Sequence, residues 1–294
     1  MDARESINEP FERHRPYLRA IAYRMLGSMS EADDALQEAW LRVRDEAPAG
    51  VQNMRAWLTT VVARICLNLL RARRTRREQL TDFHVPDPVV TALDDVDPMH
   101  KALVADSVGL ALLVVLDSLS PAERLAFVLH DVFSVPFAEI ATVLDRSEAA
   151  AQQLASRARR RVRGSAEPDR DLVRQRAVVD AFFAAARDGD FDALIKILAP
   201  DVELRIDGGE LRAETSVLLR GPQAVAAHTA TYSGLYPYLR PVLVNGAAGV
   251  VVIPRDQLFS VMAFTVVNER IARIDVLSDP ERLARLRRHV PPSR

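Results

Sequence analysis

Two adjacent glutamines and six arginines lie in the segment RSEAAAQQLASRARRRVRG, from Arg146 to Gly164. A glutamine amide can pair with both N6 and N7 of an adenine in the DNA major groove, and an arginine guanidinium can bind a backbone phosphate. At about 100 degrees per residue, a helix over this segment has one polar and one apolar face. The polar face carries the candidate DNA-binding residues Ser147, Ala149, Gln152, Gln153, Ser156, Arg157 and Arg160, and the apolar face carries Ala151, Leu154, Ala155, Ala158 and Val162.

The segment PFAEIATVLDRS directly before it predicts a first helix and a tight turn, so that the two helices form a helix-turn-helix. Ala149 leaves the start of the exposed face without bulk, where DNA can approach closely. The alternative is an ordinary surface helix whose arginines serve solubility. Alternating charges would suit that alternative better than six arginines against one glutamate.

A second basic segment, residues 54–77, has seven arginines and no acidic residue. Its helical pattern predicts a buried stripe made of Trp57, Leu58, Val61, Ile65 and Leu69. The opposite side presents Arg64, Asn68, Arg71 and Arg74, which we interpret as a second nucleic-acid surface. The alternative, basic residues that complement the dipole at a helix C-terminus, accounts for one or two of these arginines.

An acidic segment, residues 31–38, has four acidic residues and no basic one. Asp33, Asp34, Gln37 and Trp40 lie there or directly after it at helical spacing, and the carboxylates would repel DNA phosphates. We therefore expect these four residues to bind a protein surface. For Trp40, a place in the core is the alternative.

The elements that must position these residues are of two kinds. In the first 165 residues, apolar positions recur every three or four residues, which predicts helices. Further on, two helical segments lead into period-two alternation at Val202, Leu204 and Ile206, and the segments VMAFTVV and RIARIDVL flank Asn-Glu as two hairpin strands would. The sequence predicts a multidomain chain, all-α in its first part and α+β, with a curved antiparallel sheet, in its last.

Two breaks set the expected domain boundaries. The segment DFHVPDPVVTALDDVDP, with three prolines and five acidic residues, predicts an extended linker, and GSAEPDRD separates the helical part from the α+β part. We expect helical domains over 1–80 and 106–165, a linker over 81–105 and an α+β domain over 172–294.

Composition excludes several classes of protein. The chain has 39 basic and 40 acidic residues, so nucleic-acid binding must come from local surfaces rather than from the net charge. A single cysteine, Cys66, excludes an internal disulfide framework, and we expect it in the core. The histidines lack metal-ligand spacing, and no signal sequence or apolar run of about 18 residues is present, so we expect no metal, no membrane contact and a cytoplasmic location.

Three segments together resemble regions 2 and 4 of bacterial extracytoplasmic-function (ECF) sigma factors: EADDALQEAWLRV, RAWLTTVVARICLNLLRARR and LSPAERLAFVLHDVFSVPFAEIATVLDRSEAAAQQLASRARRRV. The likeness extends over about residues 8–165. The whole chain is similar to the group in which region 4 is followed by a SnoaL-like domain of the NTF2-like fold, here residues 172–294. This resemblance implies a cone-shaped C-terminal domain, and control by that domain rather than by a membrane anti-sigma partner.

The resemblance also implies a function: the chain would bind core RNA polymerase and direct it to promoter DNA, as a monomer when free, with no catalytic residues and no cofactor. The segment with Asp33 corresponds to the one that docks on the coiled coil of the polymerase β′ subunit. The loop 47–53 and the helix with Arg64 correspond to the minus-ten surfaces. Residues 147–160 correspond to the minus-thirty-five recognition helix, and the last turn of that helix with the preceding helices corresponds to the β-flap contact.

Three further segments correspond, with changed residues, to the linker, a loop and the tail of this group: HVPDP at 84–88, DGGE at 207–210 and SDPERL at 278–283. We hypothesise that the linker and the loop lie against each other and hold a state whose promoter spacing is wrong until polymerase binds. The residues of this regulatory contact would be Pro86, Asp87 and Pro88 on the linker and Asp207, Gly208 and Gly209 on the loop.

Two other functions stay open at this point. One is a ligand-responsive helix-turn-helix regulator that does not depend on polymerase, which would leave the 54–77 surface and the acidic helix unexplained. The other is a cyclase or isomerase of the SnoaL-like type, for which Asp207, His228 and Tyr232 are the candidate catalytic residues. We expect no enzyme activity, and a small-molecule ligand in the C-terminal pocket is a further alternative.

Overall fold

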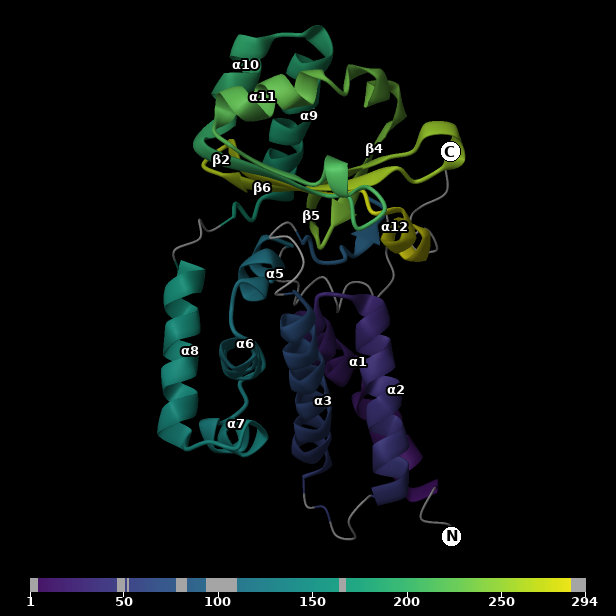
Figure 1. Cartoon of the computed structure of the whole chain (residues 1–294), viewed down its shortest axis with the longest axis vertical. Helices are drawn as coiled ribbons and strands as arrows, with labels where there is room; N and C mark the ends of the chain where they lie inside the picture. The colour runs from purple at the N-terminus through teal and green to yellow at the C-terminus, as the bar shows by residue number, and fades with distance from the viewer. Residues whose placement is uncertain are drawn as a thin grey trace. The chain divides into compact units, whose positions relative to one another are not determined.

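A computed structural model describes residues 5–46, 51, 53–77, 84–93, 110–163 and 168–286 of the chain. Its internal contacts define two compact units: unit 1 holds residues 1–80 and 115–165, and unit 2 holds residues 81–114 and 166–294. The described residues of unit 1 are helical, and those of unit 2 combine helices with a sheet (Figure 1). The predicted fold class, helical domains followed by an α+β cone, is confirmed.

The first part of unit 1 consists of three long helices, α1 (Glu5–Leu26), α2 (Met29–Glu46) and α3 (Met54–Arg77). Gly27 follows α1 with φ +74, a left-handed conformation that favours glycine at a helix C-terminus. Helix α1 contains two prolines, Pro10 and Pro16. Packing offsets the cost of these prolines: Phe11 is fully buried, with its ring centroid 5.4 Å from that of Trp40 on α2.

The second part of unit 1 begins within α5 (Leu110–Asp117) and continues with α6 (Pro121–Phe127), a π-helical turn (Val128–Val132), α7 (Phe137–Leu144) and α8 (Glu148–Arg163). A capping box starts α6: the Ser120 hydroxyl accepts from the Glu123 amide at 3.3 Å, and the Glu123 carboxylate accepts from the Ser120 amide at 3.0 Å. Asp145 adopts φ +54 after α7 and permits the tight turn into α8. Helices α7 and α8 form the predicted helix-turn-helix.

The two parts of unit 1 pack against each other through a buried arginine. Arg124 on α6 is 2% exposed, and its Nε and Nη2 donate to the backbone oxygen of Arg24 at 3.1 and 3.0 Å. Its Nη1 pairs with Asp117. Nearby, the ring of Phe133 meets Tyr17 edge-on, with centroids 5.4 Å apart. The guanidinium satisfies a carbonyl in the last turn of α1, which that helix leaves without an internal partner.

Unit 2 is built on a seven-stranded sheet in the order β1-β4-β5-β6-β7-β2-β3. The strands are β1 (Val90–Thr91), β2 (Leu198–Asp207), β3 (Val217–Arg220), β4 (Leu239–Val244), β5 (Ala247–Val252), β6 (Ser260–Val267) and β7 (Arg270–Leu277). The expected antiparallel sheet needs one correction, because β2 and β7 are parallel. A parallel pair needs a long connection, and here β3 to β6 lie between its two members.

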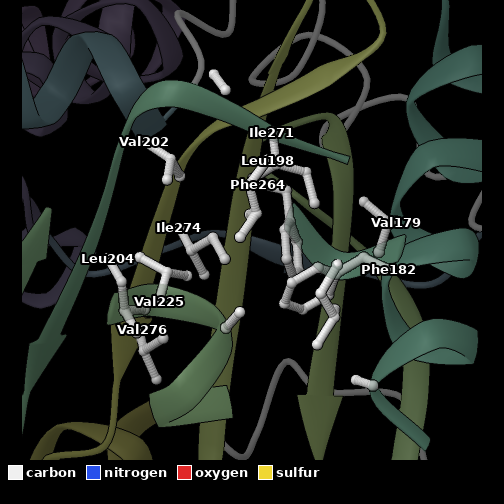
Figure 2. Packing of buried hydrophobic residues seen from close by; sticks show 14 of the residues in the cluster. Val179, Phe182, Leu198, Val202, Leu204, Val225, Phe264, Ile271, Ile274 and Val276 are labelled. Atoms are coloured by element: carbon white, nitrogen blue, oxygen red, sulfur yellow. The ribbon is translucent and has the colours of Figure 1, made fainter. Parts of the chain in front are cut away.

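Helices cover one face of this sheet. Figure 1 shows α9 (Leu172–Asp188), α10 (Phe191–Ile197) and α11 (Pro222–Ala230) together on that face. A last helix, α12 (Pro280–Leu286), follows β7. In Figure 2, Val179 and Phe182 of α9 point toward Phe264 of β6, and Leu204 and Ile274 come from neighbouring strands.

The strand and hairpin predictions for this unit are confirmed. Val202, Leu204 and Ile206 are buried while Glu203 and Arg205 are half-buried, as the period-two pattern indicated; Asp207, at the end of the strand, is buried as well. Asn268 and Glu269 join β6 to β7 with φ values of +50 and +61, the left-handed pair that a two-residue hairpin turn requires.

The described part of the linker, residues 84–93, is not simply an extended spacer. Its strand β1 pairs antiparallel with β4, with Val90 opposite Val244 and Thr91 opposite Leu243. The Val89 amide also donates to the Asn245 side chain at 2.9 Å. A sheet edge carries unpaired backbone groups, and the linker satisfies those of β4. This was not predicted from the sequence.

Candidate functional site

Helix α8 presents all seven predicted DNA-binding residues to solvent: Ser147, Ala149, Gln152, Gln153, Ser156, Arg157 and Arg160 are exposed. On its other side, Ala151, Leu154, Ala155 and Ala158 are buried, as expected, and Val162 is half-buried. The Ser147 hydroxyl accepts from the Ala150 amide at 3.2 Å, so it caps the helix. The structure thus places the glutamines in the first turns of one uninterrupted face.

Two other arginines of α8 hold the helix in place, which sequence reasoning missed. Arg159 Nε donates to Asp131 at 2.6 Å, and Arg161 Nη1 lies 3.2 Å from Glu123. Burial alone would raise the pKa of Glu123, but hydrogen bonds from Ser120 and the charge of Arg161 hold it below its ordinary value. The sequence offered one signal for these ion pairs, because the acidic residues Glu123 and Asp131 lie in the helices before α8.

Helix α3 exposes Arg64, Asn68 and Arg71, whereas the side chain of Arg74 lies outside the described residues. Arg64 is already engaged: its Nη2 donates to the backbone oxygen of Thr142 on α7 at 3.0 Å. This bond uses one of the five N–H donors of the guanidinium, so the others remain available for a phosphate. The loop expected at 47–53 is described only at Val51 and Asn53.

The predicted buried stripe of α3 needs a correction. Leu58 and Ile65 are buried, but Trp57, Val61 and Leu69 are only half-buried. Val62, Leu67 and Leu70 are buried instead, because α3 packs against α1, α2, α6 and α7. Cys66 is fully buried as expected, and burial raises the pKa of its thiol to about 12.

Helix α2 exposes Asp33, Asp34 and Gln37. Asp33 receives two bonds from Arg19, at 2.7 and 2.8 Å. Trp40 is half-buried, with its ring against that of Phe11 on α1. Leu41, which sequence reasoning did not single out, is 44% exposed and lies one turn after Gln37.

The linker and the loop after β2 meet within unit 2, through the carboxylate of Asp207. Its Oδ2 accepts from the Val85 amide at 2.9 Å and from Arg282 Nη1 at 2.7 Å. Arg282 Nε also donates to Asp87 at 2.5 Å, and Nη2 donates to the Val85 carbonyl. We call these contacts among Val85, Asp87, Asp207 and Arg282 the linker clasp. Burial alone would raise the pKa of Asp207, but hydrogen bonds from His84 and Val85 and the charge of Arg282 hold it far below its ordinary value.

The other predicted regulatory residues are neighbours in the sequence of those that form the linker clasp. Pro86 and Pro88 are buried. A Cβ on Gly208 would lie 2.2 Å from the Arg212 carbonyl, and one on Gly209 would lie 2.3 Å from Asp279. Both glycines are therefore needed for close packing. Arg282 was missed, although the tail segment SDPERL that contains it had been compared with the family.

A separate cavity of about 140 Å³ lies between the sheet and its covering helices. His228 and Tyr232, two of the three candidate catalytic residues, line it, with ring centroids 5.2 Å apart. Asp207 does not, and no acidic side chain of the described residues does. Asp275 is also turned away, because its neighbours Ile274 and Val276 on β7 point into the cavity.

Two further features concern membrane-spanning helices and metal sites. No helix in the described ranges is both long and apolar enough to cross a membrane. Within the same residues, no three His, Cys, Asp or Glu side chains are grouped so that they could hold a metal ion.

Comparison with known proteins identifies relatives for each part. Residues 10–76 match the family model for sigma-70 region 2, and residues 109–162 match the model for sigma-70 region 4. The ECF RNA polymerase sigma factor SigJ of Mycobacterium tuberculosis is 43% identical over 250 residues, which cover 81% of this chain and 78% of SigJ. The probable ECF RNA polymerase sigma factor SigI of the same species is 34% identical over 300 residues, 98% of each chain.

The solved structure of SigJ agrees with the sequence relatives. The crystal structure of SigJ covers 96% of this chain and 99% of its own, with a TM-score of 0.76 and 35% identity. An NTF2-like protein from Burkholderia xenovorans covers 40% of this chain and 98% of its own, with a TM-score of 0.27 and 26% identity.

Proposed function

Because the chain belongs to the extracytoplasmic-function family of RNA polymerase sigma factors, we propose that its exposed helical surfaces act together in transcription initiation. The protein binds core RNA polymerase and directs it to promoters. One observation carries the assignment of surfaces: the seven polar-face residues of α8 are all exposed, while the apolar side of the same helix is buried.

In this proposal α8 binds the upstream promoter element. Only the first turns of a helix that enters the major groove reach base edges, and Gln152 and Gln153 lie there. Arg157 and Arg160 lie further along and suit phosphates, which position the protein without reading sequence. Arg64, Asn68 and Arg71 of α3 would contact the downstream element.

Helix α2 is assigned to the polymerase, at the coiled coil of its β′ subunit. Asp34 and Gln37 are exposed on one face, and Leu41 adds apolar area one turn later. A carboxylate surface with an apolar centre suits a protein partner and repels DNA. The helices before α8 would contact the β flap.

Unit 2 is assigned a regulatory and not a catalytic role. The linker clasp holds residues 84–93, which lie between the two sigma regions in the chain, on the surface of unit 2. A segment fixed in this way has less freedom to let regions 2 and 4 separate along a promoter. The carboxylate of Asp207 already accepts hydrogen bonds in the linker clasp, which argues against a catalytic role for it.

Co-purification with core polymerase and run-off transcription test the initiation function. We expect the full chain to bind core polymerase. We expect Asp34→Lys to weaken this binding about tenfold, because it puts a positive charge where the proposed interface uses a negative one. The matched control is Asp192→Lys, which changes an exposed acidic residue of α10. A chain that does not bind core polymerase would contradict the proposal, and equal binding by both variants would contradict the assignment of α2.

Transcription by Arg282→Gln tests the linker clasp. The substitution removes the charge that holds Asp87 and Asp207, and we expect promoter-dependent output to change severalfold. Arg285→Gln, an exposed arginine of the same helix, should behave like the wild-type chain. Identical output from all three proteins would rule out regulation through this contact.

A further inference from the structure

We propose that the cavity of unit 2 binds an uncharged molecule about the size of one aromatic ring, which carries one hydrogen-bonding group directed at His228. This inference rests on the proposed regulatory function only where it links the cavity to the linker. The binding itself stands on the geometry of the cavity.

The size and walls of the cavity define the apolar part of the ligand. Its volume is about 140 Å³, and Phe182, Phe183, Tyr236 and Phe259 supply aromatic walls. An apolar cavity of about 150 Å³ in another protein stays dry and binds benzene. A single ring therefore fits here, and ring edges and faces are the surfaces that such walls pack against best.

We place the polar end of the ligand at His228, whose side chain lines the cavity. Nε2 of His228 is buried and has no hydrogen-bond partner among the described residues. Burial lowers the pKa of His228, which favours the neutral imidazole, and in that form one ring nitrogen donates and the other accepts. A buried polar atom without a partner destabilises the fold, and a ligand hydroxyl, which also donates and accepts, would satisfy it.

The lining also favours an uncharged ligand over a charged one. None of its described members is acidic, so nothing there would neutralise an amine. Arg212 is its one basic side chain, and it already donates to the Ser278 carbonyl at 3.4 Å and lies 5.2 Å from the centre of the Phe259 ring. An uncharged phenol-like molecule matches this set better than an acid or a base.

The same wall reaches the linker clasp. Ile206 and Ser278 line the cavity, and the Ser278 amide donates to the Asp207 carbonyl at 2.8 Å. Asp207 in turn accepts from the Val85 amide of the linker. A ligand that restrains this wall therefore restrains the carboxylate that holds the linker, and by linkage the two events favour each other.

Phenol and toluene, nearly equal in size, test the ligand class on the full chain by calorimetric titration. We expect both to bind, and phenol to bind about fivefold more tightly because it adds one buried hydrogen bond. His228→Phe should abolish this difference while it keeps toluene binding, which also shows that the variant is folded. Tyr238→Phe, outside the cavity lining, should keep the difference, and Leu235→Trp should weaken both compounds by filling the cavity.

Three results would overturn the proposal: neither compound binds, the preference for phenol persists in His228→Phe, or Leu235→Trp leaves both affinities unchanged. Hydrogen exchange at the Val85 amide tests the link to the linker. We expect phenol to slow this exchange severalfold, and an unchanged rate with phenol bound would refute the link. Each of these results is independent of whether Arg282→Gln alters transcription, so the ligand and the regulatory proposals can fail separately.

Discussion

At the scale of single residues, Gln153 and Arg160 of α8 should differ in what they contribute to DNA binding. A glutamine that pairs with a base discriminates between sequences, whereas an arginine on a phosphate does not. We expect Gln153→Ala to reduce discrimination for the upstream element by about 1–3 kcal/mol and Arg160→Ala to weaken binding to all sequences alike. Fluorescence anisotropy on specific and scrambled duplexes measures both, with Arg187→Ala on α9 as a control for lost charge. Equal losses on both duplexes for Gln153→Ala would show that it does not read a base.

A second residue-scale prediction concerns Asp275, a carboxyl that is 2% exposed on β7. Burial raises its pKa to about 6; Arg273 and Arg205 lower it, and Glu203 raises it. The unfolded chain loses this proton near pH 3.9, roughly two pKa units earlier than the folded chain does. Stability from this group is therefore complete below about pH 4 and is lost as the pH rises through about 6.

Asp275→Asn should consequently raise the free energy of unfolding of unit 2 at pH 7, by up to about 3 kcal/mol, and much less at pH 4. Urea unfolding followed by circular dichroism measures this change. Fluorescence of Trp40 and Trp57 follows unit 1, which should not respond, and Asp201→Asn controls for an exposed carboxyl. A gain that is larger at pH 4 than at pH 7 would contradict the assignment.

At the scale of elements, the attachment of α6 to the end of α1 depends on Arg124. Arg124→Met keeps an apolar chain of similar length but leaves the Arg24 carbonyl and the Asp117 carboxylate without this donor. Removing one member of a buried pair costs about 3–5 kcal/mol, and we expect unit 1 to lose that much stability. Tryptophan fluorescence in urea measures it, with the exposed Arg146→Met as control. A loss below about 1 kcal/mol, typical of a surface ion pair, would show that the contact is not structural.

Elements with strong periodicity could be predicted from the sequence, and contacts between distant segments could not. The two faces of α8 and the β6–β7 hairpin could be predicted, because each depends only on the spacing of residues within one short segment. Pairing of β1 with β4, by contrast, joins Val90 to Val244, and no local pattern encodes that partner.

The candidate functional residues show the same contrast between local patterns and contacts of distant segments. All seven residues predicted for the polar face of α8 are exposed, because exposure on an amphipathic helix follows from its own sequence. Arg282 was missed because its importance comes from carboxylates at Asp87 and Asp207, which are distant in the chain. Arg159 and Arg161 were not among the predicted DNA-binding residues, but their ion pairs were not predicted either, since charge alone does not identify a structural partner in another helix.

At the scale of the whole molecule, the linker clasp should control which promoter spacings the protein accepts. A chain ending at about residue 168 lacks β4, Asp207 and Arg282, so residues 84–93 lose every partner that unit 2 gives them in the structure. Regions 2 and 4 are then joined by a less restrained linker, and restraint worth about 1 kcal/mol corresponds to about a fivefold preference. We expect the truncated chain to transcribe from a broader range of spacings between the two promoter elements than the full chain.

A promoter library that varies only this spacing, transcribed with core polymerase, measures the distribution for each protein. The full-length Arg282→Gln chain should shift part of the way toward the truncated one, because it loses the ionic contacts of the linker clasp but keeps the pairing of β1 with β4. Arg285→Gln should match the wild-type chain. If all four proteins prefer the same spacings to the same degree, unit 2 does not act through the linker. A change in total output without a change in spacing preference would place its effect on polymerase binding instead.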